Sequence, residues 1–428
     1  TISFIDLGLI IVDEEHDTSY KQQDPAPRYH ARDTAIYYAS LFNAKVLLGS
    51  ATPALESYYN AVSGKYGLAE LNERWGQVSL PAITLIDTRR FLQKDGSKVI
   101  VTPVLQQAIQ RSLDDQNQVI LFRNRRGYSP YQVCKVCGWI PQCRNCDVSL
   151  TYHKLTNKLL CHYCGSSYPP VHTCAACGSQ QFLQRNFGTE RIEEELESIF
   201  PKARVARMDV DSVRGKSAHD QLIKLFEQQK VDILIGTQMV VKGLDFDRVD
   251  LVGILDADSL LNFSDFRVNE RAFQLMEQVS GRAGRKDGKG KVLIQVANLK
   301  HPVLQYVMAH DYKLFYEQEL VARQQFFYPP FSRIIRIIFR HKIKELVHDA
   351  AALFALQMKK DFERYINGPA EPVVGRIRNQ YIMELMLKLP RNGRTIAYAK
   401  QVIQQQKAIL QSDRKFRSVT VLADVDPV

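Results

Sequence analysis

The sequence of 428 residues contains no apolar run that approaches the about eighteen residues of a membrane-spanning helix, which excludes a span of that kind. It also lacks a signal-peptide pattern near Thr1, and a strand-like stretch from Ile5 to Val12 begins almost at once. We therefore expect a fragment that starts inside a domain. Cysteine is absent outside residues 134–177, which argues against a disulfide framework elsewhere in the chain.

The composition is that of an ordinary globular protein, with 45% hydrophobic and 24% charged residues, and its length suits two to four domains. The net charge of +11 is unevenly spread. From Val321 to the end, 19 Lys and Arg stand against 9 Asp and Glu, and Asp147 is the one acid between Arg123 and Arg185. These basic regions favour a polyanion such as nucleic acid, although a solvated basic surface would have the same composition.

All eight cysteines occur in four Cys-x-x-Cys pairs, each of which can present two thiolates to one metal from a tight turn. Two pairs make a tetrahedral site, so the spacing predicts two structural zinc ions, and a disulfide framework is the weaker interpretation. Three ways of combining the pairs fit the spacing. We expect the nested one, with an outer set of Cys134, Cys137, Cys174 and Cys177 and an inner set of Cys143, Cys146, Cys161 and Cys164.

Acidic residues follow the first predicted strand. The apolar run from Leu9 to Val12 ends in Asp13-Glu14-Glu15-His16, and the next apolar run, from Val46 to Leu48, ends in Gly49-Ser50-Ala51-Thr52-Pro53. One carboxylate at such a strand end can hold Mg²⁺, and a second can orient and deprotonate an attacking water.

Two later segments also combine glycine with polar and basic side chains. Gly236-Thr237-Gln238 follows an apolar run and precedes Lys242-Gly243-Leu244-Asp245-Phe246. Gln278 precedes Gly281-Arg282-Ala283-Gly284-Arg285, whose two arginines can reach phosphate oxygens.

In this order the four blocks resemble motifs II, III, V and VI of superfamily 2 helicases. Four further features resemble one family, the bacterial PriA replication-restart helicases (primosomal protein N′). They are the aromatic-rich stretch from His16 to Asp33, Arg123-Asn124-Arg125-Arg126-Gly127-Tyr128 after a strand, the four cysteine pairs, and residues 421–427. The resemblance covers essentially the whole chain and implies a bacterial, cytoplasmic, nucleoid-associated protein.

Helicases of this kind need a phosphate-binding loop, G-x-x-x-x-G-K-[ST], before the acidic motif, and this sequence has none. Gly215-Lys216-Ser217 does not supply it, because Val210 stands where the first glycine belongs. We therefore expect a carboxyl-terminal fragment that lacks the P-loop and the amino-terminal DNA-binding region, and that binds ATP poorly.

The resemblance implies a set of residues that bind ATP and Mg²⁺: Asp13, Glu14, His16, Gly243, Gln278, Arg282 and Arg285. Asp13 would hold Mg²⁺, Glu14 would be the general base, and Arg282 and Arg285 would stabilise the transferring phosphoryl group. For His16, a relay between nucleotide and DNA competes with a simple helix cap.

The resemblance also implies a set of DNA contacts: Tyr20, Lys21, Arg28, Tyr29, His30, Arg123, Arg126, Thr237, Gln238 and Lys242. The aromatic side chains can stack on single-stranded bases, with packing of their own loop as the alternative. The basic and polar side chains can contact phosphates of any sequence, as a translocating motor requires.

We expect an α/β fold with two RecA-like parallel-sheet helicase lobes. Residues 1–80 would be the carboxyl-terminal part of lobe 1, and residues 81–325 would be lobe 2, interrupted by a zinc-binding module at 130–182. In lobe 2, predicted strands alternate with helices, which indicates a parallel sheet. The strands are expected at Val119–Phe122, Val205–Met208, Ile233–Ile235, Leu251–Leu255 and Val292–Val296, and the helices at Arg191–Ile199 and Ala218–Gln228.

Residues 326–428 would form a small α/β DNA-binding domain. The apolar periodicity predicts the order β-α-β-β-α-β, the split arrangement of ferredoxin-like domains. The elements are expected at Phe331–Arg340, Glu345–Tyr365, Pro372–Asn379, Tyr381–Leu389, Thr395–Leu410 and Phe416–Asp424.

The sequence therefore leads us to expect an ATP-dependent 3′→5′ DNA helicase that restarts stalled replication forks and takes part in primosome assembly. The implied partners are forked and single-stranded DNA, single-stranded DNA-binding protein, primosome proteins and the replicative helicase. One alternative is another superfamily 2 motor, acting on RNA or as a restriction translocase. A second alternative is a zinc-dependent DNA-binding and partner-docking module without motor activity.

Overall fold

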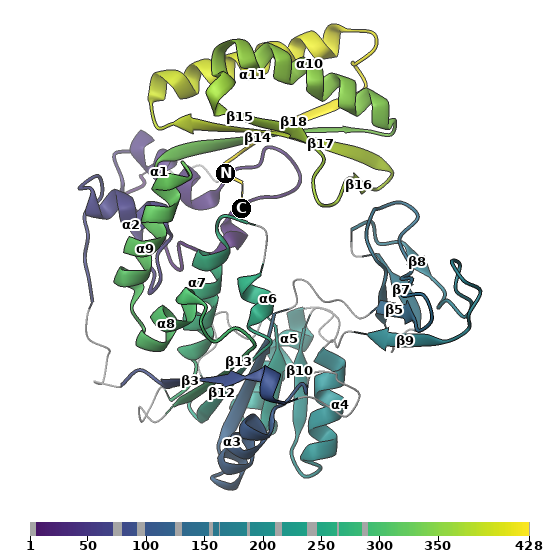
Figure 1. The fold of residues 1–428 in the computed structure, drawn as a ribbon. Coiled ribbons are helices and arrows are strands. Elements are labelled where there is room, and N and C mark those ends of the chain that lie inside the picture. Colours follow the sequence, from purple (N-terminus) through teal and green to yellow (C-terminus); the bar gives the residue numbers. More distant parts are fainter. Residues whose placement is uncertain are drawn as a thin grey trace. The chain divides into compact units, whose positions relative to one another are not determined.

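The computed structural model describes residues 6–71, 79–91, 99–124, 131–153, 157–161, 163–185, 189–209, 216–237, 246–262, 265–284 and 290–427. Contacts divide the chain into two compact units (Figure 1). Unit 1 comprises Thr1–Leu68, Cys134–Gln181 and Leu320–Val428, and unit 2 comprises Ala69–Val133 and Phe182–Glu319. Within the described ranges, no helix has both the length and the hydrophobicity needed to cross a membrane. The domain bounds expected from the sequence stay predictions.

A six-stranded parallel sheet forms the centre of unit 2, in the order β10-β11-β4-β12-β13-β3. The five strands expected from the sequence are confirmed, and β3 at the sheet edge was not expected. The strands are β3 (Ala82–Asp87), β4 (Gln118–Arg123), β10 (Val205–Met208), β11 (Ile233–Gly236), β12 (Val249–Leu255) and β13 (Lys291–Val296). The associated helices are α3 (Pro103–Asp114), α4 (Thr189–Ile199), α5 (Lys216–Glu227), α6 (Asp258–Leu261), α7 (Val268–Ser280), α8 (Pro302–Ala309) and α9 (Tyr312–Gln325), the last of which continues into unit 1.

The central strands of this sheet carry apolar runs, such as Val119–Phe122 of β4 and Leu251–Leu255 of β12, whose consecutive residues are all buried because both faces of the sheet are covered. On one face, Val119 and Leu121 of β4 pack with Leu105 of α3 and Ile192 of α4. The start of α3 follows local rules, since Pro103 occupies its first turn and the Thr102 hydroxyl accepts a hydrogen bond from the N–H of Leu105.

The first segment of unit 1 contains two parallel strands, β1 (Leu9–Val12) and β2 (Lys45–Leu48), in a register that pairs Val12 with Leu48. Parallel strands are normally covered on both faces, but Leu9, Ile11 and Leu47 are each more than half exposed. The accompanying elements are the short helix η1 (Thr18–Tyr20) and the helices α1 (Ala31–Leu41) and α2 (Leu55–Val62).

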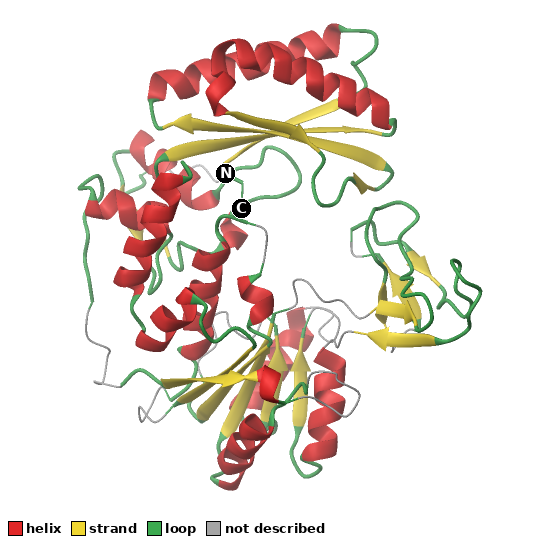
Figure 2. Ribbon diagram, in the orientation of Figure 1, coloured by secondary structure: helices red, strands yellow, loops and turns green. Residues whose placement is uncertain are grey.

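The last segment of unit 1 is an antiparallel sheet in the order β15-β17-β14-β18, with two helices on one face (Figure 2). Numbered along the chain without the short β16, these strands lie in the order 2-3-1-4, which is 4-1-3-2 from the other edge. The expected ferredoxin-like arrangement is therefore confirmed. The elements are β14 (Ser332–His341), α10 (Lys344–Phe362), η4 (Glu363–Tyr365), β15 (Ile366–Ala370), β16 (Arg376–Ile377), β17 (Gln380–Pro390), α11 (Gly393–Ser412) and β18 (Thr420–Val425).

One strand expected in this domain was placed wrongly. The second strand of the sheet is β15, at Ile366–Ala370, and not Pro372–Asn379. Only Arg376 and Ile377 of the expected segment are in a strand, as the short arm β16 of a hairpin with β17. The sequence predicted a helix as far as Tyr365, so the strand that follows it closely was overlooked.

The cysteine-rich segment is built from short strands around the cysteines. Leu150 and Leu159 are buried in its small core together with Cys143, Cys146 and Cys161. Its strands are β5 (Tyr131–Cys134), which pairs with β9 (Phe182–Arg185), and the sheet β6 (Thr151–His153), β7 (Lys158–Leu160) and β8 (Ser167–Tyr168).

Candidate functional site

The acidic strand end predicted from the sequence is formed by β1 and β2 together. Because the two strands are parallel and in register, Asp13 emerges beside Gly49, whose N–H donates to the carbonyl of Val12. The approach is close, since a Cβ at Gly49 would lie 3.5 Å from Asp13 Oδ1. Asp13 is exposed, and its Oδ1 accepts the N–H of Glu14, whose φ of 47° turns the chain away from the strand. This placement leaves the Asp13 carboxylate open to a cation.

His16 connects the two segments that resemble motifs II and III. Its Nδ1 lies 2.7 Å from Ser50 Oγ and 3.5 Å from the carboxylate of Glu14. Ser50 Oγ also accepts the N–H of Thr52 at 3.0 Å, which shapes the loop after β2. The side chains of Glu14, His16 and Ser50 therefore form one polar chain.

Glu15 is a residue whose role the sequence analysis missed. Its side chain is 1% exposed and accepts hydrogen bonds from Arg32 at 2.8 Å, the N–H of Ala54 at 2.6 Å and Ser57 Oγ at 2.8 Å. Burial opposes the charge on Arg32, but Asp33 and Glu15 raise the pKa of its guanidinium above the ordinary value. Glu15 therefore ties α1 and α2 to the acidic strand end, and the sequence signal was the third acid of the run 13–15.

The aromatic-rich stretch contacts both β1 and the carboxyl-terminal domain. The Tyr20 hydroxyl donates to the carbonyl of Asp13 at 2.8 Å, and burial, followed by the charges of Asp13, Asp17 and Glu14, raises the pKa of Tyr20.

Lys21 is buried, and its Nζ lies 2.9 Å from Asp424 and 2.7 Å from the carbonyl of Val425. Arg28 Nη1 lies 3.4 Å from the same carboxylate. Tyr29 is 46% exposed, and His30 precedes the first residue of α1. The DNA contacts expected of these residues stay predictions.

Four further predicted residues belong to unit 2. Arg123 ends β4, and burial lowers the pKa of its guanidinium despite the nearby Asp256. Thr237 is buried after β11, with its N–H directed at the carbonyl of Met208 at 3.4 Å. Gln278 lies in α7, and Arg282 is buried just after that helix. Arg126, Gln238, Lys242, Gly243 and Arg285 lie outside the described residues.

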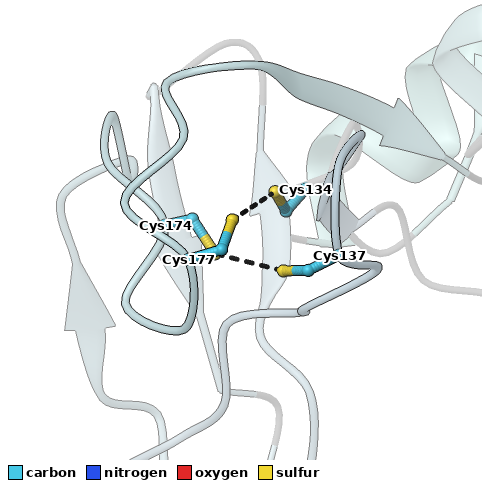
Figure 3. A group of neighbouring side chains, drawn as sticks. All are labelled: Cys134, Cys137, Cys174 and Cys177. Atoms are coloured by element: carbon cyan, nitrogen blue, oxygen red, sulfur yellow. Dashed lines mark hydrogen bonds between the residues drawn. The ribbon is translucent and has the colours of Figure 1, made fainter.

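The eight cysteines form two separate clusters, each with four sulfurs within 4.8 Å of one another. One cluster is the expected outer set, shown in Figure 3, and the other is the expected inner set, so the nested pairing is confirmed. Neighbouring sulfurs are 3.5–3.6 Å apart for Cys134 and Cys177, Cys137 and Cys174, and Cys143 and Cys164.

These distances suit zinc. Four thiolates at about 2.3 Å from a tetrahedral Zn²⁺ lie about 3.8 Å from one another, close to the separations found here. The thiols differ in pKa. The N–H of Cys137 lowers the pKa of Cys134 to about 6, whereas burial raises the pKa of Cys161 to about 12. A closed set of four thiolates leaves no open position for substrate, so each cluster fits a structural ion.

Three family models match parts of the chain in succession. The model of the "PriA DNA helicase Cys-rich region (CRR) domain" matches residues 143–169. The "Helicase conserved C-terminal domain" matches residues 180–287, and the "Primosomal protein N C-terminal domain" matches residues 324–428.

Whole-chain relatives agree with these matches. Replication restart protein PriA of Bacillus subtilis (strain 168) is 39% identical over 426 residues, which are 99% of this chain and 52% of the relative. Replication restart protein PriA of Chlamydia pneumoniae is 40% identical over 429 residues, with 99% of this chain and 56% of the relative covered. The chain thus spans about half the length of these curated relatives. With such identity along nearly all of its residues, the chain belongs to the PriA family of replication restart proteins.

Proposed function

We propose that this chain forms part of an ATP-dependent DNA helicase that moves 3′→5′ and restarts stalled replication forks. The observation that carries the proposal is the acidic strand end, where the parallel register of β1 and β2 places Asp13 beside Gly49 and His16 beside Ser50. Family membership and the match to a helicase domain over residues 180–287 support the same reading.

Asp13 and Glu14 would have different roles in ATP hydrolysis. Asp13, exposed at the strand end, would hold Mg²⁺ through water, and bound Mg²⁺ would offset the charge of the nucleotide phosphates. The Glu14 carboxylate, 43% exposed, would orient the attacking water and accept its proton. His16 Nδ1 is hydrogen-bonded to Ser50 and lies 3.5 Å from the Glu14 carboxylate, so a movement of the loop after β2 would reach the general base through His16.

Arg282 and Arg285 would stabilise the charge that develops on the transferring phosphoryl group, with Gln278 and Gly243 as further nucleotide contacts. Two arginines suit this task because each guanidinium stays charged and offers several donors in a fixed plane.

DNA contacts are proposed for both units, and they comprise Tyr20, Lys21, Arg28, Tyr29, His30, Arg123, Arg126, Thr237, Gln238 and Lys242. Tyr29 has the exposed ring that base stacking needs. Lys21 and Arg28 would reach a phosphate only by leaving Asp424, so we rank them behind Tyr29. Single-stranded DNA-binding protein, primosome proteins and the replicative helicase are proposed partners on family grounds.

The decisive experiment measures ATP hydrolysis, with and without forked DNA, by a form of the protein that includes a P-loop upstream of Thr1. Strong stimulation by the fork, lost in Glu14→Gln and retained in a control such as Glu345→Gln, is the expected result. Glu345 is an exposed carboxylate of α10, so its variant removes one charge away from the strand end. Stimulation that survives Glu14→Gln would remove Glu14 from the role of general base.

A second candidate function is a zinc-dependent DNA-binding and docking module without motor activity. Two closed cysteine clusters and the absence of a P-loop sequence from this chain favour it for the chain alone. Titration of ATP against this chain and against the longer form separates the candidates. Binding of DNA by both forms, with no ATP hydrolysis by either, would favour the docking module.

A further inference from the structure

The four Cys-x-x-Cys turns differ in the residue that follows the second cysteine. Three of them are followed by glycine, at Gly138, Gly165 and Gly178, with φ between +74° and +77°. A positive φ suits glycine because it has no Cβ, and it lets the chain fold back over the second cysteine. Each of these turns directs the N–H of the residue after the glycine at the sulfur of its second cysteine, from Trp139 to Cys137, Ser166 to Cys164 and Ser179 to Cys177.

The fourth turn, Cys143 to Cys146, is followed by Asp147 instead of glycine. Its second sulfur, on Cys146, accepts an N–H from Arg378, with N and Sγ 3.2 Å apart. Arg378 belongs to the carboxyl-terminal domain, so the amide that the other turns supply locally comes here from far along the chain.

Arg378 lies at the tip of the hairpin between β16 and β17. Arg378 and Asn379 have φ of +52° and +59°, the pattern of a type I′ turn. The antiparallel pairs Arg376–Tyr381 and Ile377–Gln380 close this turn on its strand side. The tip is therefore a defined structure that can present its N–H groups in fixed directions.

The same hairpin contacts the turn through main-chain groups at two more points. The N–H of Asp147 donates to the carbonyl of Arg376 at 2.9 Å, and the N–H of Asn379 donates to the carbonyl of Asn145 at 2.8 Å. The Arg376 guanidinium lies 3.0 Å from the Asp147 carboxylate. Ile377 packs against the core of the inner cluster, which includes Cys143, Cys146 and Cys161.

We propose that the hairpin of β16 and β17 completes the inner zinc site, so that docking of the carboxyl-terminal domain and zinc retention by the inner set stabilise each other. Hydrogen bonds to a metal ligand orient it and adjust its basicity, and loss of such a partner typically weakens metal binding about 10–100-fold. The outer set closes all its turns locally and is independent of the hairpin. This inference does not depend on the proposed function.

The first test compares two substitutions at Arg378 by the rate of zinc release to a coloured chelator. Arg378→Pro removes the N–H and, because proline fixes φ at about −65°, also breaks the turn at the tip of the hairpin, whereas Arg378→Gly keeps the N–H and suits the positive φ. We expect two release phases in the unmodified chain, with the inner phase assigned from a Cys174→Ser variant that lacks a complete outer set. Arg378→Pro should accelerate the inner phase about tenfold and leave the outer phase unchanged, and Arg378→Gly should resemble the unmodified chain.

Equal rates in Arg378→Pro and the unmodified chain would overturn the proposal. Equal acceleration of both phases would also overturn it, because it would indicate general loosening of the segment.

The second test perturbs the zinc sites and measures the response of the hairpin, so it does not require Arg378 variants to fold. Amide hydrogen exchange of residues 376–381 is measured in Cys161→Ser, which breaks the inner set, and in Cys174→Ser, which breaks the outer set. Both cysteines are buried and each is the first of its pair, so the variants are matched. Mutual stabilisation requires faster exchange of the hairpin in Cys161→Ser alone. Unchanged exchange there would show that the hairpin does not sense the inner site.

Discussion

Lys21 and Asp424 form an ion pair in which Nζ lies 2.9 Å from Oδ1 and each side chain is 1% exposed. Arg28 and Arg336 approach the other oxygen of the same carboxylate at 3.4 Å and 3.3 Å. One carboxylate on β18 therefore collects three cations, two of them from the aromatic-rich stretch near the start of the chain. The position of that stretch is tied to the carboxyl-terminal sheet.

Asp424→Asn is expected to destabilise unit 1 strongly. The substitution leaves the Lys21 ammonium buried without its counter-charge, and removal of one partner of a buried pair costs about 3–5 kcal/mol. Urea unfolding measures the change in the free energy of unfolding. Asp349→Asn is the control, since it breaks an exposed pair with Lys415 and should cost less than about 1 kcal/mol. Similar losses in both variants would contradict the role given to burial.

Glu15 and Glu14 are adjacent acids whose substitutions are expected to change stability to very different extents. Glu15→Ala removes the acceptor of the Arg32 guanidinium, the Ala54 N–H and the Ser57 hydroxyl, so we expect a loss of about 3–5 kcal/mol. Glu14→Ala removes a side chain that is 43% exposed and should change stability little. Thermal unfolding of the two variants is the check, and a larger loss in Glu14→Ala would contradict the assignment.

Removal of metal is expected to unfold the cysteine-rich segment. Its core consists largely of the ligands themselves, so without zinc little apolar surface remains to hold it. Elemental analysis should find two zinc ions per chain, and a chelator should change the fluorescence of Trp139, which follows the first cysteine pair. Retention of the native spectrum after complete zinc loss would contradict a structural role for the metal.

The stability of unit 2 should depend on pH through Glu195 of α4. Burial raises the pKa of this carboxyl above its usual range, although its hydrogen bond from the N–H of Val101 and the charge of Arg191 oppose the shift. An acid with a raised folded pKa contributes stability at low pH that is lost as the pH rises through that value. Glu195→Gln should therefore stabilise unit 2 at neutral pH and have no such effect at low pH.

Urea titrations of unit 2 at the two pH values provide the measurement for Glu195. Glu194→Gln, at the neighbouring exposed position, is the control and should show no comparable difference. A stabilisation by Glu195→Gln that is equal at both pH values would rule out ionisation as its cause.

Much of unit 2 and of the carboxyl-terminal domain was predictable because periodicity reports local burial. The apolar runs that became β4, β10, β11, β12 and β13 predicted a parallel sheet, which the structure confirms. The strand Ile366–Ala370 was not predicted, because Asn367, Gly368 and Pro369 carry no strand signal and only pairing with β17 makes the segment extended.

The sequence by itself determined the four cysteine pairs and the acidic strand end, because ligand spacing and strand-end position are local properties of the chain. The spacing left open which pairs share a site, and the tertiary structure decided that. Tertiary structure decided the partners of Glu15, Lys21 and Cys146. Glu15 pairs with Arg32, Lys21 pairs with Asp424, and Cys146 accepts the Arg378 amide. No local sequence pattern encodes contacts between residues so far apart in the chain. A buried charge or sulfur needs a polar partner. The sequence shows that such a group is present, but only the folded chain shows which partner lies within reach.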